Sequence, residues 1–183
     1  MDRRNMVHSG DGGLPTEGRF RMIAGRFYRI VPTARRDQAL SPALSPEGRF
    51  HHSGQPTLYV SSRPDWAEHA IQAYVKEGDP PRIICELEVA GARVLDLRDA
   101  AQCADWRAEP ALAAVPWLPE RAAGNAASTW RVSDLARQGG ADGMIYTARS
   151  APSRWHLVLF DWLSPRVGAR LTGRTLPYPL RAD

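Results

Sequence analysis

The 183-residue chain contains no run of about 18 apolar residues, the minimum for a helix that crosses a membrane. Its first residues, MDRRNMVHSGDGG, also lack the apolar stretch of a secretory signal peptide. These two absences predict a cytoplasmic protein that neither spans nor binds a membrane. The composition, with 43% hydrophobic and 24% charged residues, is that of an ordinary folded domain, and the length favours a single one.

Cysteine is scarce. The chain has 2 cysteines, Cys85 and Cys103, which are too few for a disulfide framework and too isolated for a zinc motif. The histidines do not supply a metal site either. His51 and His52 are adjacent, so on a strand their side chains point to opposite sides and cannot share one ion. We therefore expect no metal in this protein.

Lysine is almost missing. Lys76 is the only lysine among 24 basic residues, and the formal net charge is +4. Arginine suits phosphate and carboxylate ligands, but no basic block with interleaved aromatic residues is present, so direct nucleic-acid binding is not expected. The chain also lacks a glycine-rich phosphate loop set between a strand and a helix. A G-x-S-x-G elbow is missing too, which argues against the common serine hydrolases.

The pattern that remains predicts an α+β fold with a mostly antiparallel sheet, because strands and helices mix without regular β-α-β alternation. Strands are expected where β-branched and aromatic residues gather: RFYRIV, PTLYVSS, PRIICELEV, RVLDL, GMIYT and WHLVLFDW. The AGA between the third and fourth of these is expected to form a turn.

Helices are expected in three places. One begins at Asp65, a good N-cap, and runs to about Lys76. Residues 98–127 are rich in alanine and interrupted by proline, which indicates short helices broken by turns. A last helix follows Ser128 and stops at two glycines. The resulting division is a flexible arm at residues 1–24, a folded domain at 25–163 and an extended tail at 164–183.

Four polar residues are candidates for a site, and each has a plain alternative. Glu68 lies in the first helical turn, either as a helix-end charge or as a carboxylate facing a cleft beside the preceding strand. Arg49 is a surface arginine or a two-pronged phosphate ligand. Arg29, inside an aromatic strand, needs a partner if it is buried. Tyr59 faces away from its two apolar neighbours, as core filler or as a polar contact.

The order of these residues resembles the RES domain family, which is named for its Arg, Glu and Ser residues. The resemblance covers roughly residues 25–163. It rests on Arg29, on the run Gly48 to Ser61 with Glu68, and on the closing GADGMIYTARSAPSRWHLVLFDW. It implies a fold similar to the ADP-ribosyltransferase toxins. It further implies a toxin that cleaves NAD between nicotinamide and ribose and so arrests growth, with phosphate or water as acceptor.

The resemblance also implies roles for individual residues. Arg29 and Arg49 would hold the pyrophosphate or the acceptor phosphate, and Tyr59 would line the nicotinamide and ribose pocket. Glu68 would stabilise the oxocarbenium-like charge that develops on the ribose, or orient the acceptor. His51 stands where many relatives have asparagine and keeps a polar side chain there. NAD would be the substrate, so no cofactor is expected.

The family's serine is replaced in this chain. YTARS places Ala148 where relatives carry serine, and Thr147 and Ser150 flank it. Ser150 lies two residues further, on the same face of a strand. Three alternatives stay open: a compensating hydroxyl, a weakened toxin, or an inactive domain that binds a nucleotide or a partner. Transfer of ADP-ribose to a protein from the same pocket is a further alternative.

The partner that the resemblance implies is an antitoxin with an Xre-like helix-turn-helix region. A segment of that antitoxin is expected to cover the site at Arg49 and Glu68. The toxin is expected to form a homodimer within the resulting hetero-oligomer.

Overall fold

The structure is a computed structural model that describes residues 20–180. Its strands are β1 (Arg21–Pro32), β2 (Leu58–Ser61), β3 (Arg82–Asp96), β4 (Gly143–Ala148), β5 (Ala151–Leu159) and β6 (Arg170–Pro177). Its α-helices are α1 (Pro64–Ile71), α2 (Ala100–Trp106), α3 (Trp117–Ala122) and α4 (Ser128–Gln138). Short 3-10 helices occur at η2 (Thr33–Gln38), η3 (Gln72–Tyr74) and η4 (Pro110–Ala114). The short helices expected in the alanine-rich segment are therefore present.

The six strands form one sheet in the order β1-β2-β5-β4-β3-β6, and β1 pairs with β3 as well. This additional pairing closes β1, β2, β5, β4 and β3 into a ring. β6 adds to β3 outside it. β3 and β4 are parallel, whereas the other pairs are antiparallel. The predicted α+β fold with a mostly antiparallel sheet is thus confirmed.

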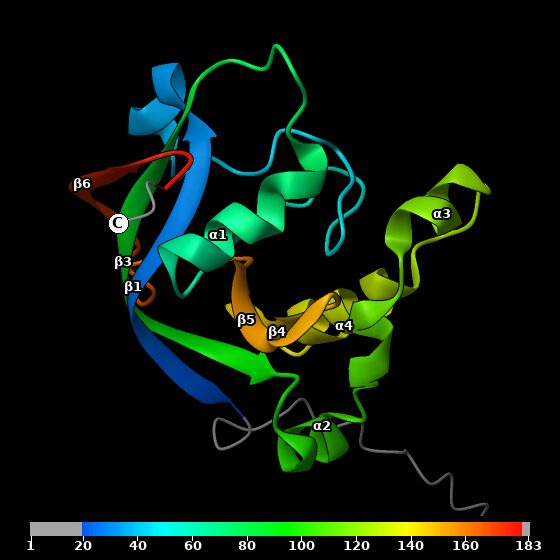
Figure 1. The fold of residues 1–183 in the computed structure, drawn as a ribbon. Helices are drawn as coiled ribbons and strands as arrows, with labels where there is room; N and C mark the ends of the chain where they lie inside the picture. Colours follow the sequence, from blue (N-terminus) through cyan, green and yellow to red (C-terminus); the bar gives the residue numbers. More distant parts are fainter. Residues whose placement is uncertain (1–19, 181–183) are drawn as a thin grey trace, which may run out of the picture.

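Strand alternation divides the side chains between two cores. Leu58 and Val60 point into the first core, which is enclosed by the curved sheet. Tyr59, between them, contacts the second core, where α2 and α4 pack on the outer face of the sheet. α1 crosses the ends of β1 and β2 on the same side (Figure 1). The space between α1 and the β4–β5 hairpin is where the candidate site lies.

β3 is one strand of 15 residues, so the turn expected at AGA is wrong. The antiparallel partner β1 runs along both halves of β3, with a register shift between Ile23 and Gly25 opposite this point. The backbone N–H groups of Ala90 and Gly91 both donate to the carbonyl of Val167. These long-range bonds satisfy backbone groups that a local turn would otherwise have used.

Both ends of the folded part extend further than the sequence suggested. β1 begins at Arg21, inside the arm expected at residues 1–24, and residues 1–19 lie outside the described residues. Residues 170–177 are β6 rather than an extended tail, and they pair with residues 83–88 of β3. A strand that pairs with a distant edge carries little local signal, because its partner decides its conformation.

The helix expected from Asp65 to Lys76 is shorter than predicted. α1 begins at Pro64, with Arg63 as N-cap and without a side-chain cap, because proline favours the first helical position. Asp65 lies in the first turn, where its Oδ1 accepts a hydrogen bond of 2.9 Å from Nε of Arg63. α1 ends at Ile71 and tightens into η3. None of the helices in residues 20–180 has the length and apolar character needed to cross a bilayer.

Candidate functional site

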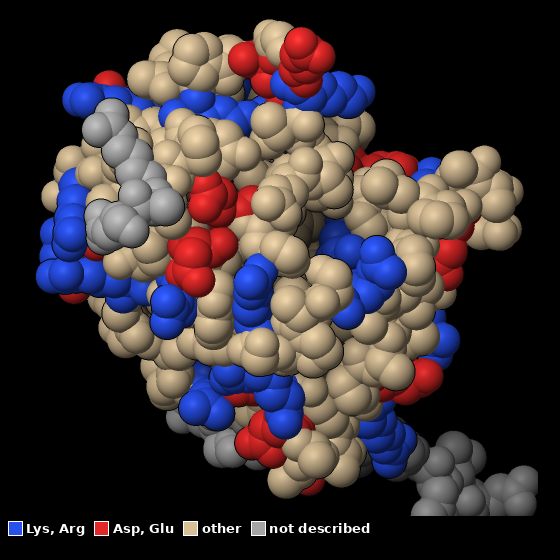
Figure 2. Space-filling model, viewed as in Figure 1, with Lys and Arg blue, Asp and Glu red and all other residues tan. Residues whose placement is uncertain are grey.

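A continuous cleft lies between α1 and the β2–β5–β4 part of the sheet. Three adjoining pockets form it, and they share Ala70 of α1 and Tyr146 of β4. The largest has a volume of about 430 Å³, within the range of small-molecule sites. Figure 2 shows a hollow near the centre of this face, with basic side chains beside it. The cleft can therefore hold an anionic ligand of moderate size.

The floor of the cleft is a row of polar side chains from four strands. Tyr28 of β1 is paired in register with Ser61 of β2, Ser61 with His156 of β5, and His156 with Tyr146 of β4. Side chains of directly paired residues point to the same face of a sheet. All four residues line one pocket of the cleft. The sheet itself thus fixes the positions of these groups.

Arg29 lies at one end of the cleft. Its Nη1 donates to the carbonyl oxygens of Ala39, at 2.8 Å, and Ser41, at 2.5 Å, which supplies the partner that a strand arginine needs. Burial lowers the pKa of the Arg29 guanidinium to about 10, so it remains charged at neutral pH. These two bonds use one terminal nitrogen, and a guanidinium has five N–H donors. Arg29 therefore holds the 39–41 loop and keeps N–H donors that these two bonds do not use.

Arg49 lines the opposite part of the cleft. Its Nη1 donates to the carbonyl of Ala113, at 3.0 Å, at the end of η4. The backbone around it is fixed by α4, because the indole nitrogen of Trp130 donates to the carbonyl of Gly48 at 2.8 Å. A Cβ at position 48 would lie 2.3 Å from Cε1 of His51, so this position requires glycine. Arg49 is therefore presented from a rigid loop.

Tyr59 and His51 form a hydrogen-bonded chain at the wall of the cleft. The His51 Nε2 lies 2.9 Å from the carbonyl of Ser45, which can only accept, so Nε2 carries the proton. Nδ1 then accepts from the Tyr59 hydroxyl at 2.9 Å, and that oxygen accepts from the backbone N–H of Phe50. Burial lowers the pKa of His51 and raises that of Tyr59, so both are neutral. His51 therefore lines the cleft, but its Nδ1 is engaged with Tyr59 and its Nε2 with the Ser45 carbonyl.

His52 takes no part in this site. Its Nε2 lies 3.0 Å from a carboxylate oxygen of Asp134 on α4, on the side away from His51. The two adjacent histidines thus face opposite directions. Within residues 20–180 no cluster of three His, Cys, Asp or Glu side chains could hold a metal ion.

Thr147 and Ser150 lie at the end of the cleft formed by the β4–β5 hairpin, together with Ala148 and Arg49. The Ser150 hydroxyl is 3.2 Å from Nε2 of His69 on α1. This contact links the hairpin to the helix across the cleft. Thr147, Ser150 and Arg49 thus line the same pocket, and Ala148 contributes no hydroxyl to it.

Glu68 is the candidate that the structure does not bring to the cleft. Its Oε1 accepts a hydrogen bond of 2.7 Å from the backbone N–H of Leu180 in the C-terminal segment. The residues of α1 that line the cleft are Ala67, His69, Ala70 and Ile71, whereas Glu68 lines none of its three pockets and lies about 100° from both Ala67 and His69 around the axis. Glu68 therefore does not line the cleft in this conformation, and its catalytic role stays a prediction.

Position 70 is the position of α1 that all three pockets share, and it carries alanine. Ala70 lines all three pockets and is exposed. Among the described residues, the one carboxylate that lines the cleft is Glu47. Its Oε2 accepts from the Nε of Arg121 at 3.0 Å. A free carboxylate for charge stabilisation is thus missing from the cleft in this conformation.

Comparison with known proteins supports the resemblance. The sequence matches the RES domain over residues 20–181. The chain belongs to the RES domain family. Among solved structures it is similar to the crystal structure of the M. tuberculosis MbcT-MbcA toxin-antitoxin complex, with a TM-score of 0.55, 15% identity and 88% of each chain covered. At that identity the likeness concerns the fold. No curated protein matched the chain.

Sequence reasoning missed three residues of this RES domain site: Ser61, Tyr146 and His156. His156 and Ser61 are each 3% exposed. Burial lowers the pKa of His156 to about 4 and raises that of Tyr146. A histidine and a tyrosine within apolar strands were visible in WHLVLF and GMIYT. Their position on the floor of the cleft follows only from the pairing of β2, β5 and β4, which cannot be predicted from the sequence.

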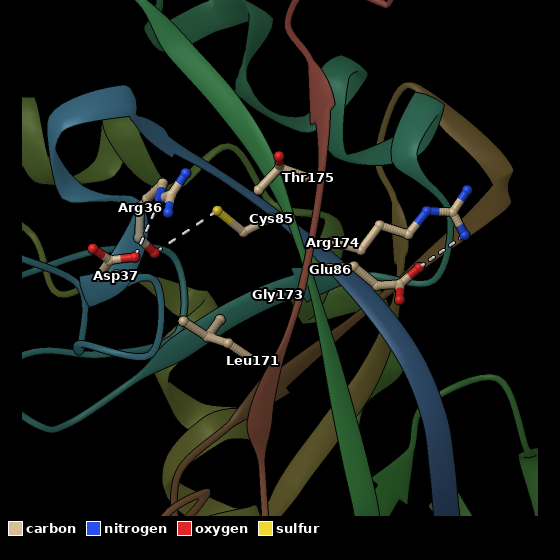
Figure 3. A pocket seen from close by; sticks show the side chains of 8 residues that line it. All are labelled: Arg36, Asp37, Cys85, Glu86, Leu171, Gly173, Arg174 and Thr175. Carbon is tan, nitrogen blue, oxygen red and sulfur yellow. Dashed lines mark hydrogen bonds and ion pairs between the residues drawn. The ribbon is translucent and has the colours of Figure 1, made fainter.

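A second hollow of the RES domain lies away from the cleft, between β3, β6 and η2 (Figure 3). The buried carboxylate of Glu86 lies 3.7 Å from Nη1 of Arg174 and 3.8 Å from Nε of Arg26. The thiol of Cys85 donates to the carbonyl of Arg36 at 3.9 Å. Because these groups are engaged with one another and no predicted site residue lines this hollow, the cleft under α1 is the better candidate.

Proposed function

We propose that this RES domain is the toxin of a toxin–antitoxin pair and that it cleaves NAD between nicotinamide and ribose. The observation that carries the proposal is the cleft, because Arg29 and Tyr59 line one of its pockets and Arg49 and Tyr59 line the adjoining one. Family membership and the fold shared with a protein from a toxin-antitoxin complex support it.

The cleft suits a dinucleotide with two charged phosphates. Arg29 and Arg49 stand at its two ends and bind the pyrophosphate or an acceptor phosphate through guanidinium donors. Tyr59 and Tyr146 offer aromatic surface for a base or for nicotinamide. NAD acts here as substrate, so the reaction needs no resident cofactor.

The acceptor binds at the β4–β5 end, beside Arg49, Thr147 and Ser150. An oxygen of phosphate or water attacks the anomeric carbon of the ribose, and nicotinamide leaves with the electron pair of the broken C–N bond. Phosphate gives ADP-ribose 1-phosphate, and water gives ADP-ribose and a proton. The Ser150 hydroxyl is held by His69. It takes the place of the family's serine, which is replaced by alanine at position 148. Transfer to a protein side chain would use the same geometry.

A second candidate function is nucleotide binding with little turnover. Two positions favour it: Ala148 supplies no hydroxyl, and Ala70 faces the cleft where a carboxylate would stabilise positive charge on the ribose. Glu68, which the resemblance assigns to that role, is held by Leu180 instead. This second function predicts NAD binding without release of nicotinamide.

The proposed partner is a cytoplasmic antitoxin with an Xre-like helix-turn-helix region. Tyr74 and Leu118 line the cleft and are 50% and 51% exposed, so they offer apolar contacts to a covering segment. Such a segment would block access to Arg49. The homodimer within a hetero-oligomer belongs to the same proposal.

The test is release of nicotinamide from NAD by the purified protein, with and without phosphate. Release in either condition supports cleavage, and dependence on phosphate identifies the acceptor. Binding of NAD without release supports the second candidate. Radiolabel from NAD on a protein band would favour protein modification. A folded protein that neither binds nor cleaves NAD would refute the proposal.

A further inference from the structure

Ser61 and His156 form a buried pair on the floor of the cleft. The Ser61 Oγ lies 2.8 Å from the His156 Nδ1, and the two residues are direct partners in the β2–β5 ladder. His156 lines two of the three pockets of the cleft, and Ser61 lines one of them. The pair is therefore fixed by backbone pairing on one side and open to a ligand on the other.

The geometry determines which ring nitrogen carries the proton. A buried hydroxyl needs an acceptor for its hydrogen, and the one acceptor that Ser61 has among the described residues is Nδ1 of His156. Ser61 therefore donates to Nδ1, and the neutral ring carries its proton on Nε2. Within residues 20–180 this Nε2 makes no hydrogen bond, and it is not enclosed by protein atoms. Its N–H is thus available to a ligand.

The surroundings favour a neutral donor. Burial lowers the pKa of His156 to about 4, so the ring is uncharged at neutral pH. The ring centroid of Tyr146 lies 5.5 Å from that of His156 and offers an aromatic surface next to the N–H. An uncharged N–H beside an aromatic ring suits a planar cationic ligand that carries its own acceptor, because a charged imidazolium would repel it. The nicotinamide of NAD, a pyridinium with a carboxamide oxygen, has this chemistry.

We propose that His156 donates from Nε2 to the carboxamide oxygen of nicotinamide, and that Ser61 is the positioning residue that fixes its tautomer. The proposal rests on the NAD pocket proposed above and adds the end at which nicotinamide lies. It places nicotinamide over the β2–β5–β4 floor, between Tyr59 and Tyr146.

Two substitutions at residue 156 distinguish the contribution of Nδ1 to NAD binding from that of Nε2. The amide nitrogen of His156→Gln reaches the place of Nε2, whereas that of His156→Asn reaches only the place of Nδ1. We expect His156→Asn to raise the Kd for NAD by about tenfold, the equivalent of one lost hydrogen bond. The Kd for ADP-ribose, which lacks nicotinamide, should not change. His156→Gln should keep most of the NAD affinity. Calorimetry gives both constants, with KM in place of Kd where NAD is turned over.

Ser61 has its own pair of variants. Ser61→Ala removes the hydroxyl that orients the ring and should lower the preference for NAD over ADP-ribose, whereas Ser61→Thr keeps a hydroxyl and should restore it. His52→Asn is the matched control, because His52 contacts Asp134 away from the cleft. Circular dichroism and a denaturant midpoint check that each variant is folded.

The outcomes distinguish this inference from the proposed function. If the wild-type protein binds NAD but His156→Asn keeps the same preference over ADP-ribose, this inference alone is wrong. An equal loss for both ligands would also overturn it, since the effect would then be general. A wild-type protein that binds no NAD would overturn the proposed function together with this inference.

Discussion

Residues 48–61 and helix α1 are neighbours in the chain, and both were expected to supply the same site, but they present their predicted residues differently to the cleft. Arg49 and Tyr59 line the cleft and are held by bonds to η4 and to the loop backbone. α1 turns Ala70 to the cleft and Glu68 toward Leu180. In a strand, residues two positions apart lie on the same face. In a helix each residue is rotated by about 100°, so Glu68 and Ala70, two positions apart, lie in different environments.

The largest effect is expected at Arg49. Arg49→Ala removes a guanidinium that lines two pockets of the cleft. A charged hydrogen bond to phosphate contributes about 1.5–3 kcal/mol, so the Kd for NAD should rise roughly 10- to 100-fold. Arg131→Ala is the control, because Arg131 is exposed on α4 and pairs with Glu109. An Arg49→Ala variant with wild-type affinity would show that the 48–61 segment does not bind the ligand.

The second largest effect is expected from a carboxylate on the face of α1 that lines the cleft. Ala70→Glu places a carboxylate on the face of α1 that lines the cleft, at an exposed position that has room for it. A carboxylate aimed at developing positive charge should raise the rate of nicotinamide release by at least about tenfold. Gln72→Glu adds the same charge outside the cleft and should have no effect. If both variants keep the wild-type rate, α1 does not limit turnover.

The sequence predicted some features of the two regions and not others, for physical reasons. The face of Tyr59 followed from the apolar residues on both sides of it, because a period of two is visible in four residues. The pairing that joins Ser61, His156 and Tyr146 in one row is long-range and left no local pattern. β6 was missed for the same reason. The role of Glu68 was taken from a family resemblance, which orders residues along the chain but does not fix their rotation around a helix.

A smaller effect is expected on stability from the tyrosines of the cleft. Tyr59→Phe leaves the Phe50 N–H and the Nδ1 of His51 without their partner, so the free energy of unfolding should fall by about 1–3 kcal/mol. Tyr146→Phe is the comparison, because within residues 20–180 its hydroxyl makes no hydrogen bond. Its loss should stay within about 0.5 kcal/mol. Equal losses in urea denaturation would show that the 48–61 segment is not held by Tyr59.

The smallest effect concerns Glu68 itself, and it separates the two interpretations of α1. Glu68→Gln keeps an oxygen that accepts from the Leu180 N–H, whereas Glu68→Ala removes it and should lower the free energy of unfolding by about 1 kcal/mol. If Glu68 only anchors the C-terminal segment, the Glu68→Gln variant should therefore keep full NAD turnover. Loss of turnover in a stable Glu68→Gln variant would mean that the charge is needed. The carboxylate would then have to leave Leu180 and reach the cleft during the reaction.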